Sequence, residues 1–340
     1  MMKRIPRWLP GALVSILLIA ILLYFVDLGA MVEAIRKANY PILAVALVLS
    51  IVWMFGRAKV WHTLLRERAT YVDTLFTDAE GYLLNTFLPF RLGELGRAFL
   101  IARKANLQFG EVLPTIVIER VVDLGISALI FIAALPLMIG TDVSQNTGYI
   151  AMVAVVVGML ALYLLAHYNR WALDLFHKLS ARWSSLQRFG GGFLESFFDG
   201  LGVLKDGWLF LRFLFWMALN WGVALAAYYL MMLAFFPQAQ FNWTLLLLAA
   251  AAFGGALPAA PGGLGTVEAA IVWAMTLLTG DGSTALALAL TVRLYNYLNS
   301  GVIGGIGLAR EGETLGSLYR ELRNLRASSG TDSAGTENEE

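Results

Sequence analysis

Apolar residues along this chain of 340 residues are gathered into long runs. Six runs predict transmembrane helices: residues 9–26, 41–55, 113–139, 149–167, 209–236 and 283–308. About 20 apolar residues cross a bilayer core of roughly 30 Å. Two further apolar stretches, residues 74–89 and 243–278, are shorter or interrupted. The pattern therefore predicts an all-α polytopic membrane protein with about six full spans and two broken helical hairpins.

The composition also favours a membrane protein. Hydrophobic residues make up 59% of the chain and charged residues only 14%, which is too apolar for a soluble globule of this size. The chain contains no cysteine, so disulfides, thiol catalysis and cysteine-based metal sites are excluded. The basic start resembles a signal peptide, but its apolar run is long for one and no convincing cleavage site follows. We therefore expect a retained first span.

Positive residues assign a side of the membrane to each loop, because cytoplasmic loops are enriched in lysine and arginine. Basic clusters at the N-terminus, at residues 57–68, in the loop 168–208 and at the C-terminus place these segments in the cytoplasm. We expect a transmembrane domain over residues 1–310 in a bacterial or archaeal cytoplasmic membrane, with both termini cytoplasmic. Two amphipathic stretches in the loop 168–208 are expected on the membrane surface. Residues 311–340 are predicted to form a disordered polar tail.

The first broken segment is expected to be a re-entrant hairpin over residues 74–111. If residues 74–89 crossed the membrane completely, Arg91 and Arg97 would lie outside and break the charge rule. Pro89 interrupts the helix, because proline cannot continue one, and Gly93 follows it. A hairpin that enters from the cytoplasm, turns at this break and returns keeps the basic residues inside.

The second hairpin is expected over residues 243–279. It is interrupted by the stretch GGALPAAPGGLG, in which the break residues are Pro258, Pro261, Gly262, Gly263 and Gly265. Both breaks contain P-x-x-L-G, and the charge rule makes the second hairpin enter from outside. This pattern favours an inverted repeat with discontinuous helices that meet near the membrane middle, where transporters bind substrate. The alternative is that so short a motif recurs by chance.

Several polar residues occur inside apolar segments, where each needs a partner or a watery cavity. The candidate substrate-binding residues are Arg91, Glu94, Arg97, Glu119, Arg120, Asp123, Glu268, Arg293 and Asn296. We expect them to line one nearly neutral polar cavity between the repeats. The two arginines near the first break suit a phosphate, through charge-assisted hydrogen bonds.

Each of these charges also has a simpler interpretation. Glu119 and Arg120 are compatible with a position at the membrane interface, and Arg97 with an ordinary cytoplasmic residue. Glu268 and Arg293 are compatible with a pair that only holds two helices together. Helical spacing puts Glu119 and Asp123 on one face, and we expect Arg120 to point elsewhere.

Three motifs in order carry a family resemblance. They are Leu88-Pro89-x-Arg91-x-Gly93-Glu94-x-x-Arg97, then Glu119-Arg120-x-x-Asp123, then Pro258-x-x-Pro261-Gly262-Gly263-x-Gly265-x-x-Glu268. The chain resembles the lysylphosphatidylglycerol synthase transmembrane-region family, a flippase-like family that includes the membrane half of the multiple peptide resistance factor. The resemblance implies movement of a lipid head group between leaflets. It does not imply synthase activity, because a polar tail stands where that factor has its aminoacyltransferase domain.

We therefore expect a lipid flippase rather than an enzyme, with no cofactor, no metal and no nucleic-acid partner. Its substrate would be a phospholipid or a polyprenyl-phosphate lipid, and its acidic residues would balance charge or carry a coupling proton. The chain has no P-loop or hydrolase signature. One alternative is a membrane-embedded transferase with Glu119 or Asp123 as general base. Another is a non-catalytic partner of a separate lipid-modifying enzyme.

Overall fold

The structure is a computed structural model, and every regular element it describes is a helix. It describes residues 27–88, 91–134, 200–256 and 261–311, together with Val153, Val157, Leu160 and Leu164. The predicted all-α class is confirmed for these residues. Several predicted features lie outside the described residues. These are the span 9–26, Pro89, Pro258 and residues 312–340 of the tail. The span 149–167 and the loop 168–208 are described only at the four residues just named and at residues 200–208.

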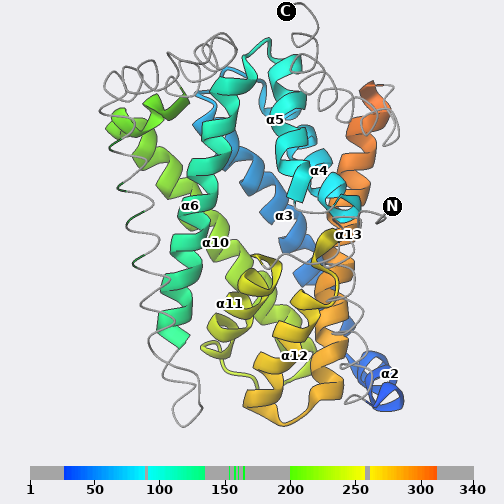
Figure 1. The fold of residues 1–340 in the computed structure, drawn as a ribbon. Helices are drawn as coiled ribbons and strands as arrows, with labels where there is room; N and C mark the ends of the chain where they lie inside the picture. Colours follow the sequence, from blue (N-terminus) through cyan, green and yellow to red (C-terminus); the bar gives the residue numbers. More distant parts are fainter. Residues whose placement is uncertain are drawn as a thin grey trace, which may run out of the picture.

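Four long helices run along the length of the molecule (Figure 1). They are α3 (Tyr40–Leu64), α6 (Phe109–Ala134), α10 (Gly207–Phe235) and α13 (Gly282–Glu311). Among the described residues, α3 and α10 are long and apolar enough to cross a membrane. Helices α6 and α13 do not meet that criterion and carry several ionisable residues. The number of six full spans therefore stays a prediction.

The first hairpin consists of α4 (Tyr71–Phe87) and α5 (Leu92–Lys104), which pack against each other. Helix α4 ends two residues before Pro89, in keeping with the restricted backbone of residues that precede a proline. The side chain of Asn85 accepts a hydrogen bond of 2.8 Å from the backbone N–H of Gly93, in the first turn of α5. A Cβ atom on Gly93 would lie 2.2 Å from the carbonyl oxygen of Gly81. Glycine at this position therefore allows the two arms to pack closely.

The second hairpin consists of α11 (Trp243–Ala256), the 3₁₀ turn η4 (Pro261–Gly263) and α12 (Thr266–Thr279). Gly262, Gly263 and Gly265 have φ values of 71°, 62° and 84°, which side chains rarely tolerate. The two hairpins occupy opposite halves of the molecule in Figure 1, α4 and α5 above and α11 and α12 below. Turn η4 contacts α4, so the two breaks meet between the halves. Their relation as an inverted repeat stays a prediction.

Basic residues gather at one end of the molecule, where ion pairs join the loop after α3 to the starts of α6 and α10. Arg68, in the loop after α3, pairs with Glu111 at the start of α6. Glu67 in the same loop pairs with Arg212 at the start of α10, at 2.6 Å. We call this end, which also holds Lys104 at the end of α5, the basic end. At the opposite end the start of α3 meets the end of α10.

Helix α3 extends beyond the expected span, and this corrects the prediction for residues 41–55. The helix continues to Leu64 because the residues after Phe55 still pack into the core. Ala58, Val60 and Trp61 are fully buried. Arg57 therefore lies within a helix in the interior and not in a cytoplasmic loop. Two smaller corrections concern the ends of elements, since residues 109–111 belong to α6 and α10 begins at Gly207.

Candidate functional site

Eight charged residues of the first half form one continuous network of alternating sign, which we call the charge chain. In order its members are Asp78, Arg97, Glu119, Arg57, Asp123, Arg120, Glu94 and Arg91, and each forms an ion pair with the next. They come from α3, α4, α5, α6 and the residue that precedes α5. Four arginines face four carboxylates, so the formal charge of the chain is zero. This neutrality agrees with the expectation of a nearly neutral polar site.

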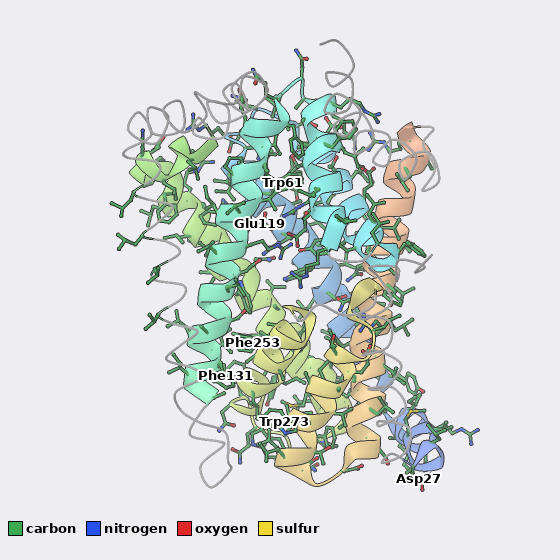
Figure 2. The ribbon with its side chains drawn as sticks, viewed as in Figure 1. Asp27, Trp61, Glu119, Phe131, Phe253 and Trp273 are labelled. Carbon is green, nitrogen blue, oxygen red and sulfur yellow. The ribbon has the colours of Figure 1, made fainter. Side chains whose placement is uncertain are left out.

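The inner end of the charge chain is buried. Arg97 donates to Asp78 and, at 3.1 Å, to Glu119, and its guanidinium lies 4.6 Å from the ring centre of Trp61. Arg57 joins Glu119 to Asp123. The side chains of Asp78 and Glu119 are 0% exposed. Figure 2 places Trp61 and Glu119 in the half of the molecule that contains α4 and α5.

The outer end of the charge chain opens to the surroundings. Asp123 also accepts a hydrogen bond of 3.2 Å from the indole N–H of Trp221 on α10. Arg120 pairs with Asp123 at 3.2 Å and with Glu94 at 2.9 Å. Arg91 pairs with Glu94 at 3.5 Å, and its side chain is 47% exposed. Side-chain exposure therefore rises from the buried inner carboxylate to the last arginine.

Arg91 connects the charge chain to the second hairpin. Its guanidinium donates a hydrogen bond of 2.7 Å to the carbonyl oxygen of Gly255, in the last turn of α11. Its backbone is left-handed, with φ 53° and ψ 35°, which is uncommon for a residue with a side chain. Gly262 of η4 packs close to Thr86 at the end of α4. The outer end of the charge chain thus lies where the two breaks meet.

A separate ion pair organises the second break. Arg293 on α13 pairs with Glu268 at 2.5 Å and donates to the carbonyl oxygens of Gly262 and Gly263. The other oxygen of Glu268 accepts a hydrogen bond of 2.8 Å from the N–H of Gly265, at the start of α12. One arginine and one glutamate therefore hold the polar backbone groups of the turn, which cannot be left unsatisfied in a membrane.

The structure distributes the predicted site residues between these two networks. Arg91, Glu94, Arg97, Glu119, Arg120 and Asp123 lie in the charge chain, whereas Glu268 and Arg293 form the separate pair. Asn296 is exposed on α13, and a hydrogen bond joins its side chain to that of Tyr228. The ion pairs among the described residues thus form two separate networks and do not support a single cavity that includes all nine.

The contacts bear on the simpler interpretations of these charges. Arg97 and Glu119 are buried and paired inside the molecule, and their depth in the membrane stays a prediction. Glu268 and Arg293 do form the helix-linking pair. The expectation that Arg120 points away from its neighbours is wrong, because residues three apart on a helix also adjoin and Arg120 reaches Asp123.

Two members of the charge chain, Arg57 and Asp78, and one neighbouring pair were not among the predicted site residues. Glu80 on α4 is buried and pairs at 3.0 Å with Lys104 on α5. The sequence did contain an indication of these two acidic residues, because Asp78 and Glu80 interrupt an apolar segment. Positions two apart on a helix face different sides, and the two carboxylates do reach different partners. Among the described residues, no group of three or more His, Asp or Glu side chains is placed to hold a metal ion.

Comparison with known proteins identifies the family. The profile described as the lysylphosphatidylglycerol synthase TM region matches residues 8–304. The chain belongs to this family. The matched region contains both hairpins, the whole charge chain and the pair at the second break. The resemblance carried by the three motifs is therefore confirmed.

A similar protein comes from an archaeon. The UPF0104 membrane protein MJ1078 of Methanocaldococcus jannaschii is 25% identical over 224 residues, which are 66% of this chain and 92% of that protein. No solved structure matches the chain. Membership of this membrane protein family points to a membrane location and a role related to membrane lipids.

Proposed function

We propose that this protein is a flippase that moves an anionic lipid head group across the cytoplasmic membrane. The substrate class is a phospholipid or a polyprenyl-phosphate lipid. The observation that carries the proposal is the charge chain, which is neutral, buried at one end and exposed at the other. Buried ionisable residues in a membrane protein mark a substrate or ion path more often than they serve stability alone.

The head group would bind at the outer end of the charge chain. Arg91 and Arg120 both pair with Glu94, so a phosphate that replaces this carboxylate would receive two guanidinium groups. Guanidinium groups bind phosphate well, because their N–H donors match its oxygens in charge and geometry. Arg97 is too deeply buried for this role, and it would instead fix the inner carboxylates.

The position of the charge chain suits translocation. Helix α6 rises about 1.5 Å per residue, so Glu119 and Asp123 lie roughly 15 and 21 Å from its first residue, Phe109. With Phe109 at the cytoplasmic edge of a bilayer core of about 30 Å, these positions would fall near its middle. Rocking of the two hairpins about their breaks would open the outer end to one side and then the other, and the Arg91–Gly255 hydrogen bond would break and re-form.

The proposed orientation places the basic end and both termini in the cytoplasm. The chain has no native cysteine, so single cysteines can be labelled with a membrane-impermeant maleimide. Lys205→Cys, at the basic end, should react only from inside, and Gln238→Cys, between α10 and α11, only from outside. Phe87→Cys, exposed at the first break, should resist label from both sides. Reaction of Phe87→Cys from outside alone would refute the re-entrant hairpin, because it would mean that α4 crosses completely.

The transferase alternative receives less support from these contacts. A general base needs a lone pair that can reach the substrate proton. Glu119 is fully buried between Arg57 and Arg97, and Asp123 is held by two arginines and Trp221. Purified protein that turned over a head-group donor would nevertheless restore that alternative.

Lipid translocation in proteoliposomes tests the proposed function. Fluorescent phosphatidylglycerol and a fluorescent polyprenyl phosphate would be placed in both leaflets, and dithionite added outside would report how fast the inner lipid becomes accessible. Arg91→Ala should slow the movement at least about tenfold, as loss of one charge-assisted hydrogen bond of about 1.4 kcal/mol would. Arg36→Ala, an exposed arginine on α2 (Leu28–Lys37), is the matched control and should move lipid like the wild type.

The outcomes separate the candidate functions. Movement that depends on Arg91 but not on Arg36 supports the flippase. If folded protein moves neither lipid, the flippase proposal is wrong. Folded protein whose cellular function survives alanine at Arg91 and Arg120 would favour the partner of a separate lipid-modifying enzyme.

A further inference from the structure

Asp78 terminates the charge chain at its buried end. One carboxylate oxygen, Oδ1, accepts a hydrogen bond from Arg97. The other, Oδ2, is buried and has no hydrogen-bond partner among the described residues. The side chain is 0% exposed. A buried carboxylate oxygen without a donor is uncommon and calls for an explanation, because ionised oxygens need hydrogen bonds when water is absent.

The charge balance of the site supplies a reason. The charge chain is neutral as it stands, so a phosphodiester head group that binds at Arg91 and Arg120 brings one uncompensated negative charge. An unbalanced charge in the interior of a membrane is strongly unfavourable. The complex must therefore take up one positive charge as the head group arrives.

Binding of the head group also redistributes the arginines. If Arg91 and Arg120 turn to the phosphate, only Arg57 and Arg97 remain for the four carboxylates. Glu119 and Asp123 each contact Arg57 and one further arginine or Trp221. Glu94 lies at the open end, where displacement leaves it near the surroundings. Asp78 has one arginine partner, whereas Glu119, whose Oε2 is also buried without a hydrogen-bond partner, keeps two.

We infer that Asp78 binds one proton when an anionic head group occupies the outer end, so that lipid and proton move together. This inference rests on the proposed flippase function. The charged groups that face Asp78 are Arg97 from α5, Arg57 from α3 and Glu119 from α6, and Tyr82 lies one turn further along α4. Protonation of Asp78 removes its negative charge, so Arg97 keeps an ion pair with Glu119 alone and the occupied site becomes neutral again. The combined movement of one lipid anion and one proton carries no net charge.

Two measurements on the same proteoliposomes test this inference. Translocation of fluorescent phosphatidylglycerol is followed with dithionite, and a trapped pH dye reports proton flux. A potassium gradient with valinomycin sets the membrane potential. The wild type should carry about one proton per lipid, and its steady-state lipid distribution should not respond to the potential. A single uncompensated charge would instead redistribute about fifty-fold per 100 mV.

Asp78→Asn removes the proton site but keeps the shape of the side chain. This variant should move phosphatidylglycerol without proton flux, and the movement should become sensitive to the membrane potential. Glu80→Gln is the matched control, because Glu80 is equally buried on the same helix but pairs with Lys104 outside the charge chain. Proton flux and insensitivity to potential should persist in this control.

The possible results are distinguishable. No lipid movement by folded wild type overturns both the flippase proposal and this inference. Lipid movement that responds to the potential and carries no proton overturns the inference alone, and this result needs no variant. Proton-coupled movement that persists in Asp78→Asn also overturns it, since the proton would then bind elsewhere. Coupling in the wild type that is lost in Asp78→Asn and kept in Glu80→Gln supports it.

Discussion

The ion pair between Arg97 and Asp78 allows a direct test of the charge chain as a single electrostatic unit. Arg97 is 2% exposed and contacts two carboxylates and the ring of Trp61. Arg97→Gln leaves one excess negative charge in the interior, and removal of one partner of a buried pair costs about 3–5 kcal/mol. Asp78→Asn keeps an acceptor for Arg97, and Arg97 keeps Glu119, so we expect about 1–3 kcal/mol.

The double variant decides whether neutrality matters. Together the two substitutions remove one cation and one anion, so the remaining six residues of the charge chain are again neutral. The combined loss of stability should therefore fall short of the sum by at least about 1.5 kcal/mol, within the range measured for contacting residues. Unfolding in mixed micelles, followed by tryptophan fluorescence, gives the four free energies.

The exposed pair of Glu33 and Lys37 on α2 provides the control cycle. Its side chains are 62% and 75% exposed, and pairs so open to solvent contribute little. The corresponding double variant should show no measurable coupling. If the Arg97 and Asp78 substitutions were additive within about 0.5 kcal/mol, the charge chain would not act as one unit, and charge balance would not govern the site.

Two further predictions concern the hairpins. Gly93→Ala should destabilise the protein by about 1–3 kcal/mol in the same unfolding assay, because its Cβ would lie 2.2 Å from the Gly81 carbonyl oxygen. Gly301→Ala on α13, where a Cβ meets nothing within 4 Å, is the control and should be neutral or stabilising by up to about 1 kcal/mol. Arg293→Ala leaves Glu268 without its arginine and frees two turn carbonyls, so amide hydrogen exchange over residues 261–268 should become faster. Unchanged exchange there would mean that Arg293 does not hold the turn.

The positions of the breaks followed from local rules. Proline cannot continue a helix, and glycine adopts positive φ without strain. These properties belong to single residues and need no tertiary contact. Pro89 therefore predicts the end of α4, and the run Pro261–Gly265 predicts the start of α12. The charged motif around Glu119 was equally visible, because any ionisable residue inside an apolar run requires a partner.

The partners of those charges were not predictable from the same rules. Arg57 follows an apolar run and precedes other basic residues, so the charge rule places it in a loop. Tertiary packing instead extends α3 around Trp61 and Leu64, which brings Arg57 into the interior. Asp78 lies in a segment that is apolar on average. Its place in the charge chain becomes visible only in the folded structure, where Arg97 on α5 and Glu119 on α6 lie next to it. Pairing across helices depends on packing geometry, which periodicity along one segment does not contain.

The two ends of the charge chain are expected to have different roles. At the inner end, the side chains of Asp78, Arg97 and Glu119 are at most 2% exposed, so a substitution there should affect stability as well as the proposed proton coupling. At the outer end, Arg91 and Glu94 are partly exposed and bound more loosely, at 3.5 Å, so a substitution there should mainly affect transport. A carrier needs both properties, because a site that exchanges its own carboxylate for a substrate anion must still hold the remaining charges in place. The stable inner pairs allow the outer pairs to break and re-form as the head group passes.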